Sequence, residues 1–119
     1  MSNDYNLFQK CAAEFFGTSM IIYGGCGLVC ADRFASNWKI GPLGAPLVFG
    51  TAVAMAVYGF RDISGAHLNP AVTASLAINR PDAIPKSHVL PYIAAQMGGA
   101  TWAAGINYLV YKKGIEHFE

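Results

Sequence analysis

The chain has 119 residues, of which 54% are hydrophobic and 13% are charged, and its net charge is +1. The charged share is about half that of a typical soluble domain, so the composition indicates one membrane-embedded domain and gives no reason to expect a nucleic-acid partner. The sequence contains no nucleophile–base set and no cluster of metal ligands. We therefore expect neither an enzyme nor a cofactor-binding or metal-binding protein.

The first apolar segment runs from Cys11 to Ala31 and carries a single charge, on Glu14. Because a hydrocarbon layer of about 30 Å needs about 20 apolar residues of helix, we predict a membrane span over 11–31. An acid inside a span is a candidate for function or pairing. We expect the Glu14 carboxylate to accept hydrogen bonds from the backbone of a loop or from His67; the alternative is a residue near the span's end that reaches to the membrane surface. The three cysteines of this region are expected to be packing residues.

Two further uncharged segments, over residues 42–60 and 89–111, are also long enough to cross a bilayer. Pro91, near the start of the third segment, fits an early helical turn, where a missing N–H costs least. Small residues along all three segments favour close packing of membrane helices. The cationic residues at the predicted ends divide four against four between the two sides, so charge does not set the orientation.

Between the second and third spans lies the stretch SGAHLNPAVT, at residues 64–73. Asn69 followed by Pro70 is a strong signal for the start of a helix. The helix predicted over 69–79 is about 15 Å long, half the thickness of the hydrocarbon layer. Irregular backbone persists at membrane depth only where it lines a cavity or is buried in protein. The pattern therefore predicts a re-entrant half-helix that begins near the membrane midplane.

The chemistry of this loop suits a neutral solute. The Asn69 side-chain oxygen can cap the helix, which leaves its NH₂ group free to donate into a lumen. The positive end of the helix dipole opposes cations, including hydronium. The His67 ring is expected to be a hydrogen-bonded structural group. The residues before Asn69 are expected to run extended, with backbone carbonyls that face the lumen as acceptors: Gly65, Ala66, His67 and Leu68.

Three stretches resemble the aquaporin and aquaglyceroporin family, the major intrinsic proteins: AEFFGT at 13–18 with GGCG at 24–27, SGAHLNPAVT at 64–73, and YIAAQMGGATWAA at 92–104. The resemblance covers the chain from about residue 10 to 111. It implies a six-helix pore of two inverted repeats, with two NPA half-helices that meet at the midplane and four pores in a homo-tetramer. It further implies that Asn69, Pro70 and Ala71 form the first NPA signature, and that Glu14 is the acid that braces the loops.

The resemblance also implies that Phe49 contributes to the narrow aromatic/arginine filter, where Phe is more typical of water-selecting members than of glycerol-conducting ones. It favours an N-terminus on the cytoplasmic side. A second NPA motif, a filter arginine and a fourth to sixth helix are not present in these 119 residues. We therefore expect an all-α membrane protein with three transmembrane helices and one re-entrant half-helix, which is one aquaporin-like repeat.

The favoured interpretation is one half of a channel for water or small neutral solutes such as glycerol, present as a fragment or a truncated product. In one alternative, two copies insert in opposite orientations and pair as an antiparallel half-channel dimer, which the even division of charge allows. In another, the chain is a non-conducting membrane subunit that associates with full-length channels. Each interpretation gives a multi-pass integral membrane protein whose partners are the lipid bilayer and other channel subunits. The conducting interpretations add water or small neutral solutes.

Overall fold

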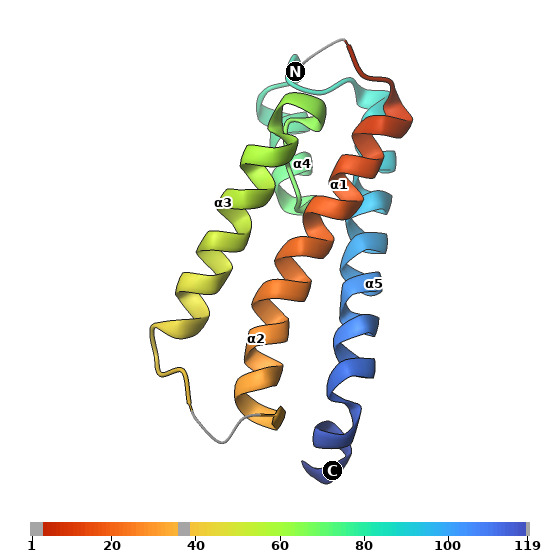
Figure 1. Ribbon diagram of the computed structural model, residues 1–119. Coiled ribbons are helices and arrows are strands. Elements are labelled where there is room, and N and C mark those ends of the chain that lie inside the picture. The colour runs from red at the N-terminus through yellow and green to blue at the C-terminus, as the bar shows by residue number, and fades with distance from the viewer. Residues whose placement is uncertain (1–3, 36–38, 119) are drawn as a thin grey trace.

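The computed structural model describes residues 4–35 and 39–118, and every regular element in these residues is a helix (Figure 1). The molecule is elongated, with extents of 49, 25 and 24 Å. A bilayer with its headgroup regions is about 40–45 Å thick. The bundle is therefore long enough to cross a membrane, and the prediction of an all-α architecture is confirmed.

The first helical run begins with a capping box at Asn6. The Asn6 side chain accepts from the backbone N–H of Gln9 at 2.8 Å, and the Gln9 side chain accepts from the backbone N–H of Asn6 at 2.9 Å. These two bonds satisfy donors that the start of a helix leaves free. Four elements then follow each other directly: α1 (Leu7–Ile21), the π-helical turn η1 (Ile22–Cys26), α2 (Gly27–Cys30) and a second π-helical turn η2 (Ala31–Ala35).

Two of the helical runs are long and apolar enough to cross a membrane, Leu7–Phe34 and the helix α3 (Gly44–Ser64). The third long helix, α5 (Lys86–Phe118), has 33 residues and is therefore about 50 Å long. Its composition is less apolar than that of the other two. Its length alone is sufficient for a span.

The spans predicted over 11–31 and 89–111 fall inside their helical runs, whereas the span predicted over 42–60 begins two residues before α3; each run is longer than its predicted span. Hydropathy marks the part of a helix that suits lipid, whereas the helix itself continues to its caps. Which residues lie in the membrane stays a prediction. Pro91 lies in an early helical turn, as predicted: α5 begins at Lys86, and Pro91 is its sixth residue, in the second turn. There the ring removes one backbone hydrogen bond from the helix.

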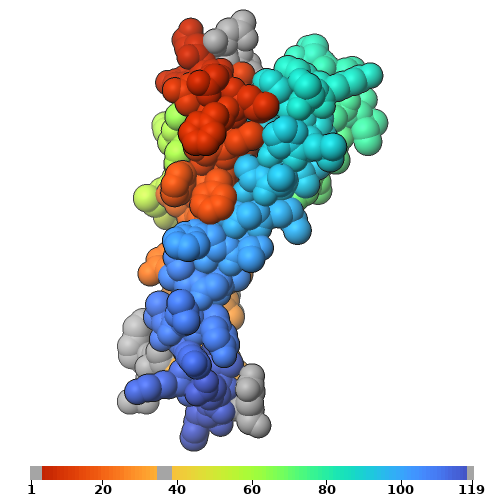
Figure 2. Space-filling model, turned by 90° about the vertical axis from the view of Figure 1, so that its right-hand side faces the viewer, coloured from red at the N-terminus to blue at the C-terminus, as the bar shows by residue number. Residues whose placement is uncertain are grey.

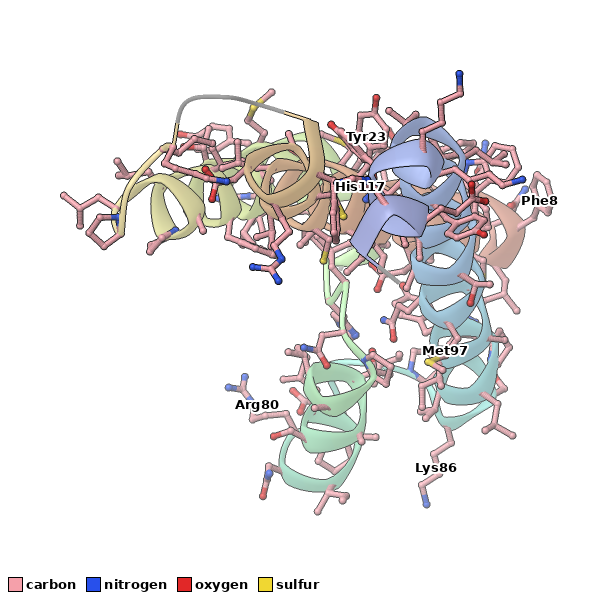
Figure 3. The ribbon with its side chains drawn as sticks, turned by 90° about the horizontal axis from the view of Figure 1, so that it is seen from below. Phe8, Tyr23, Arg80, Lys86, Met97 and His117 are labelled. Carbon is pink, nitrogen blue, oxygen red and sulfur yellow. The ribbon has the colours of Figure 1, made fainter. Side chains whose placement is uncertain are left out.

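The short helix α4 (Pro70–Asn79) returns toward the end of the bundle at which its loop begins. In Figure 1 the chain leaves α3, runs toward the middle of the bundle and comes back through α4 to the connector that leads into α5. Among the described elements α4 packs against α5 and not against α3, and Figure 3 shows it standing apart from α3. In Figure 2 α5 covers one side of the molecule, and α4 with its connector projects at one end.

The helix α1 lies between α3 and α5 and contacts both extensively. Its contact with α5 is close because Gly99 has no side chain: a Cβ atom there would lie 2.2 Å from the carbonyl oxygen of Phe15. The Ser19 hydroxyl donates across the same contact to the Gly99 carbonyl at 3.0 Å. Small residues and interhelical hydrogen bonds of this kind stabilise helix pairs in membranes.

Candidate functional site

A buried carboxylate lies at the centre of the site. Glu14, on α1, is 0% exposed and accepts four hydrogen bonds. Its Oε1 accepts from the backbone N–H of Leu68 at 2.9 Å and from Nε2 of Gln96 at 2.6 Å. Its Oε2 accepts from the Ser64 hydroxyl at 2.6 Å and from the backbone N–H of His67 at 3.2 Å. A buried charge is tolerated only when donors compensate it. Glu14 therefore joins α1 to α3, to the loop and to α5 rather than reaching to the membrane surface.

The loop that precedes α4 owes its conformation to these donors. The φ angles of Gly65, Ala66 and Leu68 are 88°, 50° and 57°, so the expectation that this stretch runs extended is wrong. The N–H of Ala66 donates to the Ser64 hydroxyl at 3.1 Å, and the next two N–H groups donate to Glu14. Successive N–H groups turned to one side form an anion-binding concavity. Left-handed backbone costs about 1–2 kcal/mol at a non-glycine residue, and hydrogen bonds to a charged group, at about 1.5–3 kcal/mol each, offset that cost.

This arrangement fixes the direction of three carbonyls. All peptide bonds that the structure describes are trans, and in a trans peptide unit the C=O points opposite to the N–H. The N–H groups of residues 66, 67 and 68 point toward Ser64 or Glu14. The carbonyls in the same peptide units therefore point away from these acceptors: that of Gly65 away from the Ser64 hydroxyl, and those of Ala66 and His67 away from the carboxylate. The Leu68 carbonyl belongs to the next unit, to which this constraint does not extend.

A second set of bonds ties the loop to α4 and α5. The Thr73 hydroxyl lies 2.9 Å from Nδ1 of His67, and it accepts from Nε2 of Gln96 at 2.9 Å. The Tyr92 hydroxyl donates to the Ser64 carbonyl at 2.7 Å. The His67 ring is therefore bonded to Thr73, and it is the backbone of His67 that Glu14 holds. All these groups are buried, so the loop and the start of α4 form one rigid unit with the bundle.

The start of α4 has the predicted capping geometry. Asn69 is extended (φ −160°, ψ 127°), its side-chain oxygen accepts from the N–H of Ala71 at 2.8 Å, and Pro70 is the first helical residue. Within the described part of the chain the Asn69 amide nitrogen, Nδ2, has no hydrogen-bond partner. A hollow of about 310 Å³ adjoins it, lined by loop residues 66–69 and by side chains of α1, η1, α3 and α4.

The filter candidate Phe49 lies far from this unit. It is on α3, 15 residues before Ser64, which is about 22 Å along the helix. Its ring packs against the η1 turn, where a Cβ atom on Gly25 would lie 2.2 Å from the ring. The structure thus brings together the residues predicted around the loop, Glu14 and 65–71, and places Phe49 in the other half of the bundle.

Sequence reasoning missed four members of the network. Ser64 and Thr73 lie at the two ends of the stretch SGAHLNPAVT, whereas Tyr92 and Gln96 lie on α5. A signal was present for the last two, because residues four apart share a face of a helix and polar side chains inside an apolar segment are functional or pairing candidates. Nothing in the sequence indicated that both face Glu14.

A ten-residue helix that starts inside a bundle of three long helices, at an Asn-Pro pair fixed by a buried carboxylate, defines a class: all-helical membrane proteins with a re-entrant half-helix. The family model described as major intrinsic protein matches residues 1–118. The chain belongs to this family, as the resemblance predicted.

Three relatives illustrate the range of similarity. Aquaporin NIP1-1 of Oryza sativa subsp. japonica is 46% identical over 110 residues, which cover 92% of this chain and 38% of the relative. The glycerol uptake facilitator protein of Escherichia coli strain K12 is 38% identical over 123 residues, with coverage of 100% and 41%. Aquaporin Z of Brucella melitensis is 38% identical over 104 residues, with coverage of 87% and 45%. The chain thus spans about two-fifths of the length of the curated relatives it matches.

Proposed function

We propose that this chain supplies one half of a transmembrane channel that conducts water or small neutral solutes such as glycerol, and that it is not an enzyme. The observation that carries the proposal is the loop held by Glu14. The N–H groups of residues 66–68 are occupied by the protein, and the carbonyls of Gly65, Ala66 and His67 are directed away from the groups that accept those N–H bonds. Such a row of acceptors can exchange hydrogen bonds with a solute that passes along it. Leu68 completes the row that we propose.

The selectivity for neutral solutes follows from the tip of α4. Asn69 presents a free amide donor, and Pro70 removes a backbone donor and fixes the start of the helix. The N-terminus of a helix carries about half a positive charge. A donor at a positive potential favours a neutral molecule with an oxygen lone pair and opposes a cation or hydronium. Asn69, Pro70 and Ala71 are therefore the proposed constriction.

We propose one half of a pore for this chain because α4 has 10 residues and is about 15 Å long. The hydrocarbon layer of a membrane is about 30 Å thick, so α4 lines only half of it. The other half of the lumen needs a second half-helix that enters from the opposite side. Relatives named aquaporin and glycerol uptake facilitator are more than twice as long as the matched region, which leaves room for that half. Assembly as a homo-tetramer belongs to the same proposal.

A chimaera tests the proposed function. The chain replaces the matched region of the Escherichia coli glycerol uptake facilitator protein, and the purified chimaera is reconstituted into liposomes. We expect stopped-flow light scattering to show water or glycerol permeability well above that of empty liposomes. A folded, monodisperse chimaera with the permeability of empty liposomes would contradict the proposal. The chain reconstituted alone is expected to match empty liposomes, and conduction by it would favour the antiparallel pair instead.

In the conducting chimaera, Asn69→Asp places a negative charge at the positive end of α4 and removes the amide donor. We expect neutral-solute flux to fall and proton or cation leak, measured with an entrapped pH dye and by ion conductance, to rise by about tenfold or more, since a unit charge in a low-dielectric site is worth more than 1.4 kcal/mol. Asn79→Asp is the control: the same change at the other end of α4, where the amide bonds only to Ser75. Unchanged ion conductance in Asn69→Asp would contradict the role of this tip.

A further inference from the structure

The π-helical turn η1 (Ile22–Cys26) lies between α3 and α5 and contacts both. A π-helical turn departs from the regular ladder of backbone hydrogen bonds; it occurs mostly as a single turn inside an α-helix, and frequently at functional sites. Its residues, with the next one, read IYGGCG and hold three glycines, at positions 24, 25 and 27. All three face a neighbouring helix, and at Gly25 and Gly27 the approach is close enough that the missing side chain matters.

On the side of α3, the ring of Phe49 occupies the space left by the missing side chain of Gly25 in η1; we call this contact the seat of the ring. A Cβ atom on Gly25 would lie 2.2, 2.3 and 2.5 Å from three ring carbons. Real Cβ atoms do not approach so closely, so the ring sits where a side chain at position 25 would have to be. Gly24 lies beside it, and a Cβ atom there would be 3.7 Å from the Cβ of Ala52. The position of the Phe49 ring is therefore set by the path of the η1 backbone.

Toward α5, the same turn is held by a buried amide. Asn107 is 4% exposed, and its Nδ2 donates to the carbonyl of Ile22, the first residue of η1, at 3.2 Å. Gly27 permits this approach, since a Cβ atom on it would lie 3.0 Å from Oδ1 of Asn107. That Oδ1 atom is buried and has no partner in the described part of the chain. Burying an amide in this way is unfavourable, and an apolar residue would avoid the cost at the expense of the bond to Ile22.

We propose that Asn107 is a positioning residue for selectivity: its amide stabilises the η1 turn, and η1 in turn places the Phe49 ring that limits the size of the conducted solute. The contact between the Phe49 ring and the η1 backbone does not depend on the proposed channel function. Its consequence for selectivity rests on the proposed function and on the filter role that the resemblance to the family implies for Phe49. A ring that shifts even slightly changes a narrow opening, and water and glycerol differ in size, so the ratio of their permeabilities reports the position of the ring.

The first arm of the test uses the 119-residue chain in lipid nanodiscs and does not depend on conduction. In the unsubstituted chain we expect nuclear Overhauser contacts between the Gly25 α-protons and the Phe49 ring, and an upfield ring-current shift of one α-proton. Asn107→Leu is expected to weaken both signals, because a hydrogen bond between membrane helices changes an equilibrium by between about 3-fold and 18-fold. Thr101→Val is the control, since that hydroxyl bonds only within α5, to the Met97 carbonyl.

The second arm measures the ratio of glycerol to water permeability in the chimaera. Gly25→Ala displaces the ring directly and serves as the reference, and Gly50→Ala, beside Phe49 but facing open space, is its control. We expect Asn107→Leu and Gly25→Ala to change the ratio in the same direction and the two controls to leave it unchanged.

Folded Asn107→Leu with the Gly25–Phe49 signals of the unsubstituted chain would overturn the proposal, as would an unchanged ratio where Gly25→Ala alters it. If Asn107→Leu does not fold, Gly25→Ala against Gly50→Ala still tests the seat: unchanged ring signals in Gly25→Ala would overturn it. Altered signals in the 119-residue chain, together with a chimaera that does not conduct, would support the seat and count against the channel function alone.

Discussion

Glu14→Gln is expected to lower the thermal unfolding midpoint of the chain in detergent by about 10 °C. Each carboxylate oxygen accepts two hydrogen bonds: Oε1 from Leu68 and Gln96, Oε2 from Ser64 and His67. Whichever oxygen becomes NH₂, at least one buried backbone N–H, that of Leu68 or that of His67, loses its acceptor and faces another donor. An unsatisfied buried group costs about 1–3 kcal/mol, and about 4 °C accompanies each kcal/mol in a chain of this size. Circular dichroism at 222 nm follows the transition.

The matched control is Glu116→Gln, on the same chain and with the same chemical change. The Glu116 side chain is 52% exposed and lies 3.9 Å from Lys112, one turn earlier on α5. Exposed ion pairs of this kind contribute little to stability, so we expect its midpoint to stay close to that of the unsubstituted chain. Equal midpoints for Glu14→Gln and Glu116→Gln would show that the carboxylate does not hold the loop.

Two alanine substitutions on α5, Gly99→Ala and Gly105→Ala, are expected to differ in stability, and only the first is expected to be destabilising. In Gly99→Ala the new Cβ atom would lie 2.2 Å from the carbonyl oxygen of Phe15 and 3.1 Å from the Ser19 hydroxyl. Backbone cannot rotate away as a side chain can, so α1 and α5 must separate, and the Ser19–Gly99 hydrogen bond is weakened. Overpacking of this kind costs about 1–3 kcal/mol or more, beyond the gain of up to about 1 kcal/mol that Ala brings to a helix.

Gly105→Ala carries the same change six residues further along α5, where no atom lies within 4 Å of the new Cβ. Only the helix-propensity gain applies there, so its stability is expected to rise slightly or to stay the same. Unfolding in mixed micelles with increasing sodium dodecyl sulfate measures both variants. A Gly99→Ala chain as stable as Gly105→Ala would contradict the close contact of α1 with α5.

Local signals in the sequence were sufficient to predict the start of the short helix α4. Asn69 and Pro70 act on their immediate neighbours, so the cap and the first turn of α4 could be predicted without the rest of the chain. The long apolar segments likewise predicted helices, although hydropathy could not show where each helix ends: α5 runs over Lys86–Phe118, beyond the predicted 89–111 at both ends. Membership of the family was predicted from the stretch at 64–73 together with those at 13–18, 24–27 and 92–104.

Contacts between distant residues could not be predicted in this way. The donors to Glu14 lie 50 to 82 positions away along the chain. The left-handed backbone at Ala66 and Leu68 contradicts the local preference of both residues. It exists because a carboxylate on another helix accepts the N–H groups of His67 and Leu68. The bond from Asn107 to Ile22 spans 85 positions and was likewise outside the reach of sequence patterns.

The depth of the two ends of α4 in a membrane tests most directly whether this helix begins inside the membrane. Lipids that carry a chelated gadolinium ion at the headgroup broaden the amide signals of residues near the surface of a nanodisc. Ala71 and Ile78 lie two turns apart on α4, a difference of about 10 Å along its axis. If α4 begins near the midplane and returns to the surface, we expect strong broadening at Ile78. At Ala71 we expect weak broadening, comparable to that at Ala56 near the middle of α3. Equal broadening at both positions, or stronger broadening at Ala71, would contradict a helix that begins inside the membrane.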